Sequence, residues 1–313
     1  MDVEHSGGEA SITHTGIGPI GRVGNAAMGR CALSSASFLF GALWPRLLLA
    51  HSGPRKLASE MPTAHRPTPM LPWLLSPLVL LLALGEAAYG RSCEAAPLRV
   101  AVDVGHSRSS FGATSATGRR EHDFNERFAQ ELLDLAKRVR TLSLFRFDDP
   151  GARLGLRDRP FIAANRNAEV FLSIHHDSVN TKYMDYWYHN GRKLQFSDVF
   201  RGFSLFIFGG PTHFQQSFKL AMEIGENLTS RGLKPTLHHA EPIAGESRPL
   251  INKDLGIYTA PFAVLRYATV PAVLFEVGVI ANREEERDLE DQAYRSKAED
   301  AVLRSLEEYC RMA

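Results

Sequence analysis

Four short segments of the chain carry side chains that could hold a metal ion and move a proton. They are VDVGH at 102–106, REHDFN at 120–125, FLSIHHD at 171–177 and AVLFEVGVIAN at 272–282. The last segment places Glu276 directly after an apolar run. Burying a carboxylate without a partner costs several kcal/mol, so one reading of Glu276 is a structural carboxylate paired with an arginine or a backbone amide. Together, however, the four segments indicate a zinc site with a glutamate base.

The pattern of strands and helices explains how such segments could meet. From Leu98 onwards, apolar strands alternate with amphipathic helices, which predicts an α/β domain with a largely parallel sheet. Strands are expected at 98–104, 142–147, 169–174, 204–208 and 273–277, and helices at 124–139, 156–167, 214–228 and 283–311.

Three of the polar residues lie where a parallel sheet binds ligands. His106 and His175 come at or just after the carboxyl ends of predicted strands, and Glu276 lies near the end of another. The carboxyl-end edge is the usual binding edge of an open α/β sheet. Catalytic zinc sites commonly use two histidines and one glutamate and leave a position for water. On this reasoning the third ligand is either Glu121 or Glu276.

The segments GH, REHDFN, VFLSIHHDS and PAVLFEVGVIANREEE, in this order and spacing, resemble the zinc-dependent N-acetylmuramoyl-L-alanine amidases, the family-3 type of bacterial cell-wall hydrolase. The resemblance runs from about Leu98 to the C-terminal helix. It implies that His106, Glu121 and His175 bind Zn²⁺ and that Glu276 is the catalytic carboxylate. It also implies a single domain with a twisted, mainly parallel sheet flanked by helices on both faces.

The resemblance further implies a substrate. This is the amide bond between the lactyl group of N-acetylmuramic acid and L-alanine in peptidoglycan, cut for cell-wall turnover or cell separation. Three features depart from the family pattern. Gly105-His106-Ser107-Arg108 replaces Gly-His-Gly-Gly, no inhibitory helical insert fits into 209–214, and the aromatic-rich insertion at 183–203 has no counterpart.

Two other functions remain open at this level. One is a different exported zinc hydrolase, such as a peptidase or a sugar deacetylase; common carboxypeptidases place a glutamate three residues after the first histidine, where this chain has Ser109. The other is a non-catalytic wall-binding protein of the same fold. A non-catalytic protein would be expected to lack a metal ligand or the base. In this chain the three ligand positions and the base position are all occupied by suitable residues, which argues against that function.

The N-terminal region has a different character. Residues 1–69 show no sustained helical or strand period and are interpreted as disordered or as not part of the true protein. Residues 70–90 contain an apolar run, LPWLLSPLVLLLAL, followed by Ala88-Tyr89-Gly90, which fits a signal peptide with its cleavage site. The alternative is an uncleaved N-terminal anchor. We therefore expect a catalytic domain at 91–313, exported to the periplasm or cell wall, with no stable membrane span after processing.

A polar loop after the fourth predicted strand offers candidates for binding the substrate. His239, Glu241 and Arg248 could line a cleft that holds a peptide stem or a glycan, or they could belong to a solvated loop. The overall charge is balanced, with 36 Lys+Arg against 35 Asp+Glu. This balance argues against nucleic acid as a partner, and peptidoglycan or muropeptides are expected instead, bound by a monomer.

The cysteines predict one disulfide bond. Cys93 and Cys310 flank the predicted domain, and the ends of a domain often lie close together. An oxidising compartment would allow them to form a bridge. The alternative is two unrelated thiols. The chain has no CxxC motif, which excludes a thiolate zinc cluster.

Overall fold

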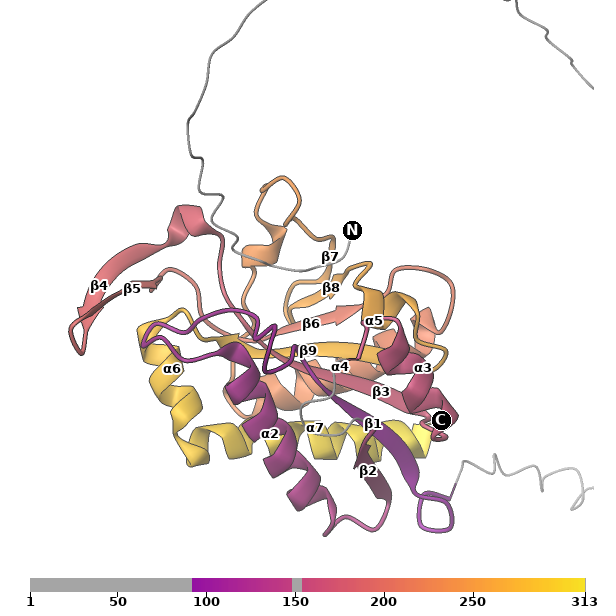
Figure 1. Cartoon of the computed structure of the whole chain (residues 1–313). Helices are drawn as coiled ribbons and strands as arrows, with labels where there is room; N and C mark the ends of the chain where they lie inside the picture. The colour runs from indigo at the N-terminus through magenta and orange to yellow at the C-terminus, as the bar shows by residue number, and fades with distance from the viewer. Residues whose placement is uncertain (1–91, 148–153, 313) are drawn as a thin grey trace, which may run out of the picture. The chain divides into compact units, whose positions relative to one another are not determined.

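The computed structural model describes residues 92–147 and 154–312, all of which fall in one compact unit (Figure 1). The predictions for 1–69 and for the signal peptide at 70–90 lie outside the described residues and stay predictions. Within the described ranges, no helix is both long and apolar enough to span a bilayer.

A seven-stranded sheet forms the centre of the domain, with the strand order β2-β1-β3-β9-β6-β8-β7. Four of its six strand pairings are parallel, whereas β6 with β9 and β7 with β8 are antiparallel. The prediction of a mainly parallel sheet is confirmed. The strands are β1 Leu98–Val104, β2 Leu142–Arg146, β3 Val170–Asp177, β6 Ser204–Ile207, β7 Leu250–Asn252, β8 Ile257–Thr259 and β9 Ala272–Val279.

Helices cover both faces of this sheet, as predicted. Helices α2, α4 and α7 enclose the larger apolar core on one face, and α3 and α5 close a second core on the other face (Figure 1). The helices are α2 Glu121–Ala136, α3 Asp158–Asn165, α4 Phe214–Ser230, α5 Ala263–Arg266, α6 Arg283–Glu290 and α7 Gln292–Met312; two short 3₁₀ turns are η1 Thr181–Tyr183 and η2 His238–Ala240.

The predicted helix at 283–311 is in fact two helices, α6 and α7. The chain breaks at Asp291, whose backbone is extended (φ −77°, ψ 120°). The Asp291 side chain then accepts a hydrogen bond from the Ala293 amide over 2.9 Å. Because Asp and Asn side chains compete for backbone amides in this way, they favour helix starts over helix interiors.

The insertion at 183–203 contains a β-hairpin made of β4 Asp185–His189 and β5 Arg192–Phe196. Asn190 and Gly191 join the strands with φ of 49° and 75°, which is the backbone of a type I′ turn. The Trp187 indole N–H donates to the Ala116 carbonyl over 2.7 Å. The Arg283 guanidinium lies 3.8 Å from the centre of the Phe196 ring. These contacts anchor the hairpin to the domain.

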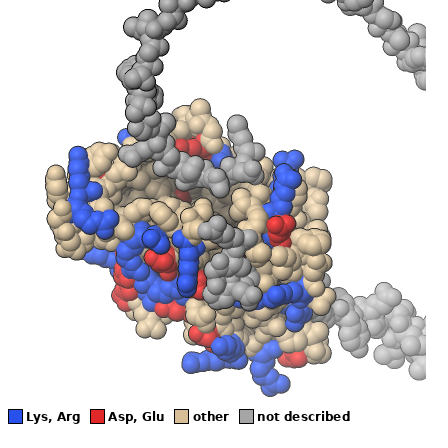
Figure 2. Space-filling model, in the orientation of Figure 1, with Lys and Arg blue, Asp and Glu red and all other residues tan. Residues whose placement is uncertain are grey.

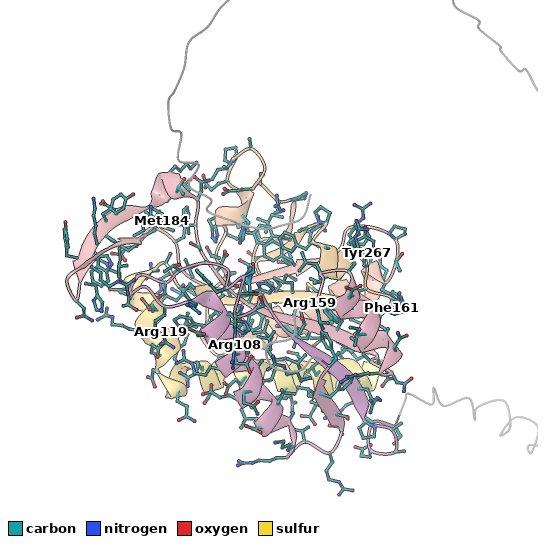
Figure 3. All side chains as sticks on the ribbon, in the orientation of Figure 1. Arg108, Arg119, Arg159, Phe161, Met184 and Tyr267 are labelled. Carbon is teal, nitrogen blue, oxygen red and sulfur yellow. A yellow bond between two sulfur atoms is a disulfide. The ribbon has the colours of Figure 1, made fainter. Side chains whose placement is uncertain are left out.

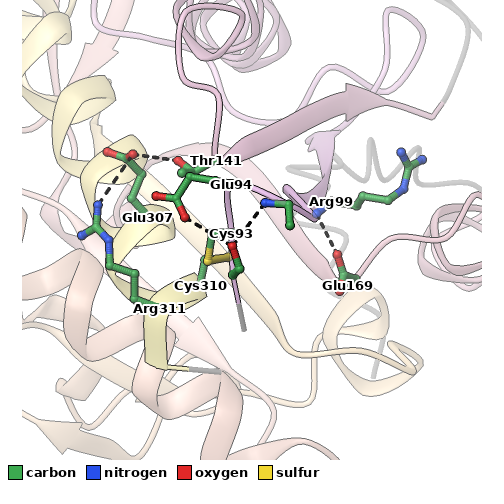
Figure 4. Close-up of a disulfide and its surroundings, with 10 residues drawn as sticks. Cys93, Glu94, Arg99, Thr141, Glu169, Glu307, Cys310 and Arg311 are labelled. Atoms are coloured by element: carbon green, nitrogen blue, oxygen red, sulfur yellow. Dashed lines mark hydrogen bonds and ion pairs between the residues drawn. A yellow bond between two sulfur atoms is a disulfide. The ribbon is translucent and has the colours of Figure 1, made fainter. Parts of the chain in front are cut away.

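A disulfide bond joins the two ends of the domain (Figure 4). It links Cys93, ahead of β1, to Cys310 in the last turn of α7, with 6.2 Å between their Cα atoms and a sequence separation of 217. Both cysteines are buried in the larger core. The structure therefore places together the two residues that the sequence analysis paired.

Candidate metal centre

Three residues converge at the carboxyl-end edge of the sheet. The ligand atoms of His106, Glu121 and His175 all lie within 4.8 Å of one another. The two imidazoles face different oxygens of one carboxylate. His106 Nε2 is 3.1 Å from Glu121 Oε2, and His175 Nδ1 is 3.1 Å from Oε1. The structure thus brings together the three residues that the sequence analysis assigned as metal ligands.

His106 lies just past the end of β1 in a left-handed conformation, with φ of 66°. A buried arginine holds this turn (Figure 3). Arg159 donates to the His106 carbonyl over 2.7 Å and to the Val104 carbonyl over 2.8 Å. Its charge is paired with Asp103, 2.9 Å away, which also accepts from the Ser173 hydroxyl. Asp103 therefore anchors the loop, which fixes the position of His106.

Two glycines allow the ligands to approach the backbone closely. A Cβ atom on Gly105 would lie 2.5 Å from the His175 ring. A Cβ atom on Gly112, where φ is +76°, would lie 2.2 Å from Glu121 Oε2. Any other residue at either position would displace a proposed ligand, because non-bonded atoms do not approach this closely.

Glu121 is buried at the first position of α2, where the positive end of the helix dipole favours a carboxylate. Its oxygens accept hydrogen bonds from the Ala113 amide (2.9 Å) and from Asn125 Nδ2 (3.1 Å). Burial raises the pKa of Glu121, but the hydrogen bonds and charges of His106 and His175 outweigh it and hold this pKa well below its usual range. Glu121 is consequently an ionised, well-oriented carboxylate.

The histidines next to the ligands in sequence point away from the centre. His176 lies on the opposite side of β3 from His175, against Phe124, and donates from Nδ1 to Asn125 Oδ1 over 2.7 Å. Burial lowers the pKa of His176 to about 3, so this ring is neutral. His122 contacts the Gly105 carbonyl through Nδ1 at 3.1 Å. Both rings support the ligands without joining them.

Glu276 lies beside the candidate metal ligands on the next strand. It is paired in register with His175, so the two side chains leave the same face of the sheet from strands roughly 4.8 Å apart. Its Oε2 atom is buried and has no hydrogen-bond partner among the described residues. Burial, and then the charges of Asp177 and Glu121, raise the pKa of Glu276 well above its usual range. A carboxyl group in this setting can hold and release a proton.

The three residues predicted to bind substrate have different surroundings. His239 reaches the sheet edge, with Nε2 2.6 Å from Asp177 Oδ2. Glu241 instead accepts a hydrogen bond from the Tyr183 hydroxyl over 3.0 Å. Arg248 donates to backbone carbonyls of its own loop. Of the three, only His239 is joined by a side-chain contact to the strand that carries His175.

The sequence analysis missed the roles of Asn125, Arg159 and Asp177. Asn125 follows Glu121 by one helical turn, which is the spacing at which side chains meet on one helix face. Asp177 follows His175 by two residues, which places both on the same side of a strand. Both spacings can be seen in the sequence, so Asn125 and Asp177 could have been identified from it. No sequence signal indicates Arg159, because α3 and β1 are brought together only by the fold.

Acidic and basic side chains alternate on the face of the domain seen in Figure 2. Arg119 and Arg127, which come from the loop before α2 and from α2 itself, both pair with Glu290 of α6. Ion pairs of this kind connect the start of α2, where Glu121 lies, to the neighbouring helix.

A mainly parallel α/β sheet with two histidines and a glutamate at its edge, next to a buried carboxyl group, is the arrangement of a metal-dependent hydrolase. The family model for N-acetylmuramoyl-L-alanine amidase matches residues 100–308, and the chain belongs to this family.

Known relatives agree with this assignment. The probable cell wall amidase LytH of Staphylococcus aureus is 27% identical over 217 residues, which cover 67% of this chain. The match spans 57% of the length of that relative.

Solved structures show the same fold. The catalytic domain of CwlV, an N-acetylmuramoyl-L-alanine amidase from Bacillus (Paenibacillus) polymyxa var. colistinus, is 24% identical with a TM-score of 0.51, covering 68% of this chain and 97% of that domain. The N-acetylmuramoyl-L-alanine amidase of Clostridium difficile 630 is 21% identical with a TM-score of 0.53, covering 68% and 96%.

Proposed function

We propose that this protein is a zinc-dependent amidase that hydrolyses the bond between N-acetylmuramic acid and L-alanine in peptidoglycan. It would act as an exported monomer in the periplasm or cell wall, in wall turnover or cell separation. The observation that carries the proposal is the convergence of His106, Glu121 and His175 beside Glu276. Membership of the amidase family supports the choice of substrate.

The donor set fits Zn²⁺. Two imidazoles and one carboxylate suit this ion, and His106, Glu121 and His175 would hold it. His106 Nε2 lies 3.1 Å from Glu121 Oε2 and His175 Nδ1 lies 3.1 Å from Glu121 Oε1, so both imidazoles face this carboxylate at the same separation. When bound, the ion supplies a Lewis acid for the amide carbonyl and lowers the pKa of water.

The side chains of the chain supply orientation and proton transfer. The hydrogen bonds and charges of His106 and His175 outweigh burial and keep the pKa of Glu121 low, so this carboxylate stays ionised and neutralises positive charge at the centre. The Ala113 amide and Asn125 orient its oxygens. Glu276 takes a proton from the attacking water and delivers it to the leaving nitrogen of L-alanine. The C–N bond breaks and a C–O bond forms, giving a free lactyl carboxyl group and a free amino terminus. The buried Oε2 atom of Glu276, which has no hydrogen-bond partner among the described residues, favours this proton-carrying role.

The test is digestion of purified peptidoglycan by the full chain, followed by mass spectrometry of the soluble products. We expect stem peptides with a free N-terminal L-alanine. Activity in a zymogram should disappear with a chelator and return with Zn²⁺. Cleavage inside the stem peptide would indicate a peptidase, and loss of acetyl groups a deacetylase. Binding to the wall without any product would indicate a non-catalytic protein.

A further inference from the structure

A second group of metal-type ligands lies at the same edge of the sheet. Asp177, His238 and His239 place one ligand atom each within 4.8 Å of one another. Asp177 Oδ2 is the shared centre, 2.6 Å from His239 Nε2 and 3.2 Å from His238 Nε2. Asp177 is the last residue of β3, and the two histidines belong to η2.

His238 presents an unused nitrogen to this group. Its Nδ1 atom lies 2.9 Å from the Thr236 hydroxyl. A proton on Nδ1, donated to that hydroxyl, leaves a lone pair on Nε2. The side chain is only 6% exposed, and Nε2 is buried without a hydrogen bond of good geometry, even to Asp177. Since buried polar atoms are usually satisfied, the imperfect contact with Asp177 leaves room for a cation shared by the two side chains.

His239 is held in place by packing. Its ring lies edge-on to Phe206, with 4.8 Å between centroids, and to Tyr258 at 5.5 Å. The rings of His238 and His239 are 4.0 Å apart. Consecutive side chains on a 3₁₀ turn normally diverge by about a third of a turn. Here both Nε2 atoms face the same oxygen, Asp177 Oδ2, so this turn brings the two imidazoles together instead of letting them diverge.

We propose that Asp177, His238 and His239 form a second divalent-cation site, of the zinc class, beside the centre described above. Two imidazoles and a carboxylate form the same donor set as the first centre. The 3.2 Å separation matches the roughly 3.3 Å between ligands at tetrahedral zinc, and the 2.6 Å contact would open by roughly 0.7 Å. Solvent would complete the coordination.

A cation here would have a defined structural consequence. It would fix η2 to the end of β3, two residues beyond His175 and on the same side of the strand. It would also place positive charge near Glu276, whose surroundings are otherwise acidic at Asp177 and Glu121. The proposal stands without the amidase activity, because it concerns ligands that the first centre does not use.

The first test counts bound metal. A chelator first removes bound metal from the full chain. The protein is then saturated with Zn²⁺ and separated from unbound metal, and the zinc bound per chain is measured by elemental mass spectrometry. We expect about two ions per chain. The variant His238→Ala/His239→Ala should retain one, and His175→Ala should likewise retain one. The matched control is His189→Ala, on the hairpin and outside both groups, which should keep two.

The second test distinguishes this site from zinc bound elsewhere on the chain. Protein loaded with ¹¹³Cd²⁺ should give two resonances, and His238→Ala/His239→Ala should lose one of them. Thr236→Val keeps all three ligands but removes the orienting hydroxyl, so cation affinity at this site should fall by about 10–100-fold. If the double variant does not fold, the number of ions bound by the wild-type chain and the cation affinity of Thr236→Val still test the proposal.

Two outcomes would overturn the proposal. A saturated wild-type chain that holds a single ion, kept by His238→Ala/His239→Ala and lost from His175→Ala, would show that Asp177, His238 and His239 form only a hydrogen-bonded cluster. The same conclusion would follow if the double histidine variant and Thr236→Val kept two ions with unchanged affinity.

Discussion

Two glutamates at the proposed active site have opposite environments. Glu121 accepts hydrogen bonds from Ala113 and Asn125. Burial raises its pKa, but the hydrogen bonds and charges of His106 and His175 outweigh burial and lower it. Glu276 has a buried oxygen with no hydrogen-bond partner among the described residues, and its pKa is raised. A carboxylate surrounded by donors suits a metal ligand, whereas a desolvated carboxyl group suits proton transfer. These different environments support the two roles proposed for the two glutamates.

This contrast predicts how glutamine substitutions will differ. Glu276→Gln keeps nearly the same shape but cannot carry the proton, so turnover should fall by a factor on the order of 100 or more while zinc stays bound. Glu121→Gln removes a charged ligand, so zinc and activity should be lost together, as they should in His106→Ala. Metal content and peptidoglycan hydrolysis are measured on the same preparations. Loss of zinc from Glu276→Gln with retention by Glu121→Gln would reverse the two roles.

At the scale of elements, α7 is fastened to α2 by a buried charged group. Arg295 of α7 binds both oxygens of Glu131 of α2, at 2.7 Å each. Glu299, one turn further along α7, is only 2% exposed. Burial, and then the neighbouring Glu131 carboxylate, raise the pKa of Glu299 to about 8. The helix interface therefore holds a proton at neutral pH.

The proton on Glu299 makes the stability of the fold depend on pH. An unfolded glutamate ionises near 4.5, whereas the folded pKa is about 8. Between these values the folded state binds more protons, so the free energy of unfolding falls as pH rises. The slope cannot exceed about 1.4 kcal/mol per pH unit, because the folded and unfolded states differ by at most one bound proton at this group.

Glu299→Gln, which is always neutral, should remove this contribution. Urea denaturation at about pH 5 and at about pH 8 should show a smaller loss of stability in the variant than in the wild type. The control is Glu284→Gln on α6, where the side chain is 66% exposed; its profile should parallel the wild type. Parallel profiles for Glu299→Gln as well would mean that Glu299 ionises normally in the folded protein.

The elements that the sequence predicted were those with long, regular patterns. The apolar strand ahead of His106, the strand ending at His175 and the amphipathic helix after Glu121 are all present. The short strands β7 and β8 were missed because three residues carry no detectable period. The antiparallel direction of β6 could not be predicted either, because strand direction depends on the path of the whole chain.

The hairpin was a different case, because its signal was present in the sequence. Asn190-Gly191 between alternating apolar and polar residues is a strong short-range hairpin pattern. Residues that meet only through the fold gave no such signal. Asp177 and His238 are far apart in the chain and come together because η2 lies over the end of β3. Sequence analysis could therefore predict ligands for the first centre, which stay a prediction, but it gave no sign that Asp177 and His238 would meet.

At the scale of the whole molecule, the disulfide bond closes almost the entire described domain into one loop. Cys93 and Cys310 are 217 residues apart in sequence. Near the bond, Glu307 of α7 accepts a hydrogen bond from Thr141, just ahead of β2, so the end of α7 also contacts the sheet directly (Figure 4). Cross-linking a long loop restricts the unfolded chain far more than the folded one.

Replacing both cysteines should therefore lower stability without changing the fold. For Cys93→Ser/Cys310→Ser we expect a loss of about 2–5 kcal/mol in the free energy of unfolding, which corresponds to a drop in Tm on the order of 10 °C. Thermal denaturation is measured with and without reductant, and reductant should lower the Tm of the wild type but not that of the double variant. In the unprocessed full chain, Cys31→Ser, outside the described residues, is the matched control and should behave as wild type. If thiol titration of the non-reduced wild type found all three cysteines free, or if the double variant melted at the wild-type temperature, the bond would not be part of the mature fold.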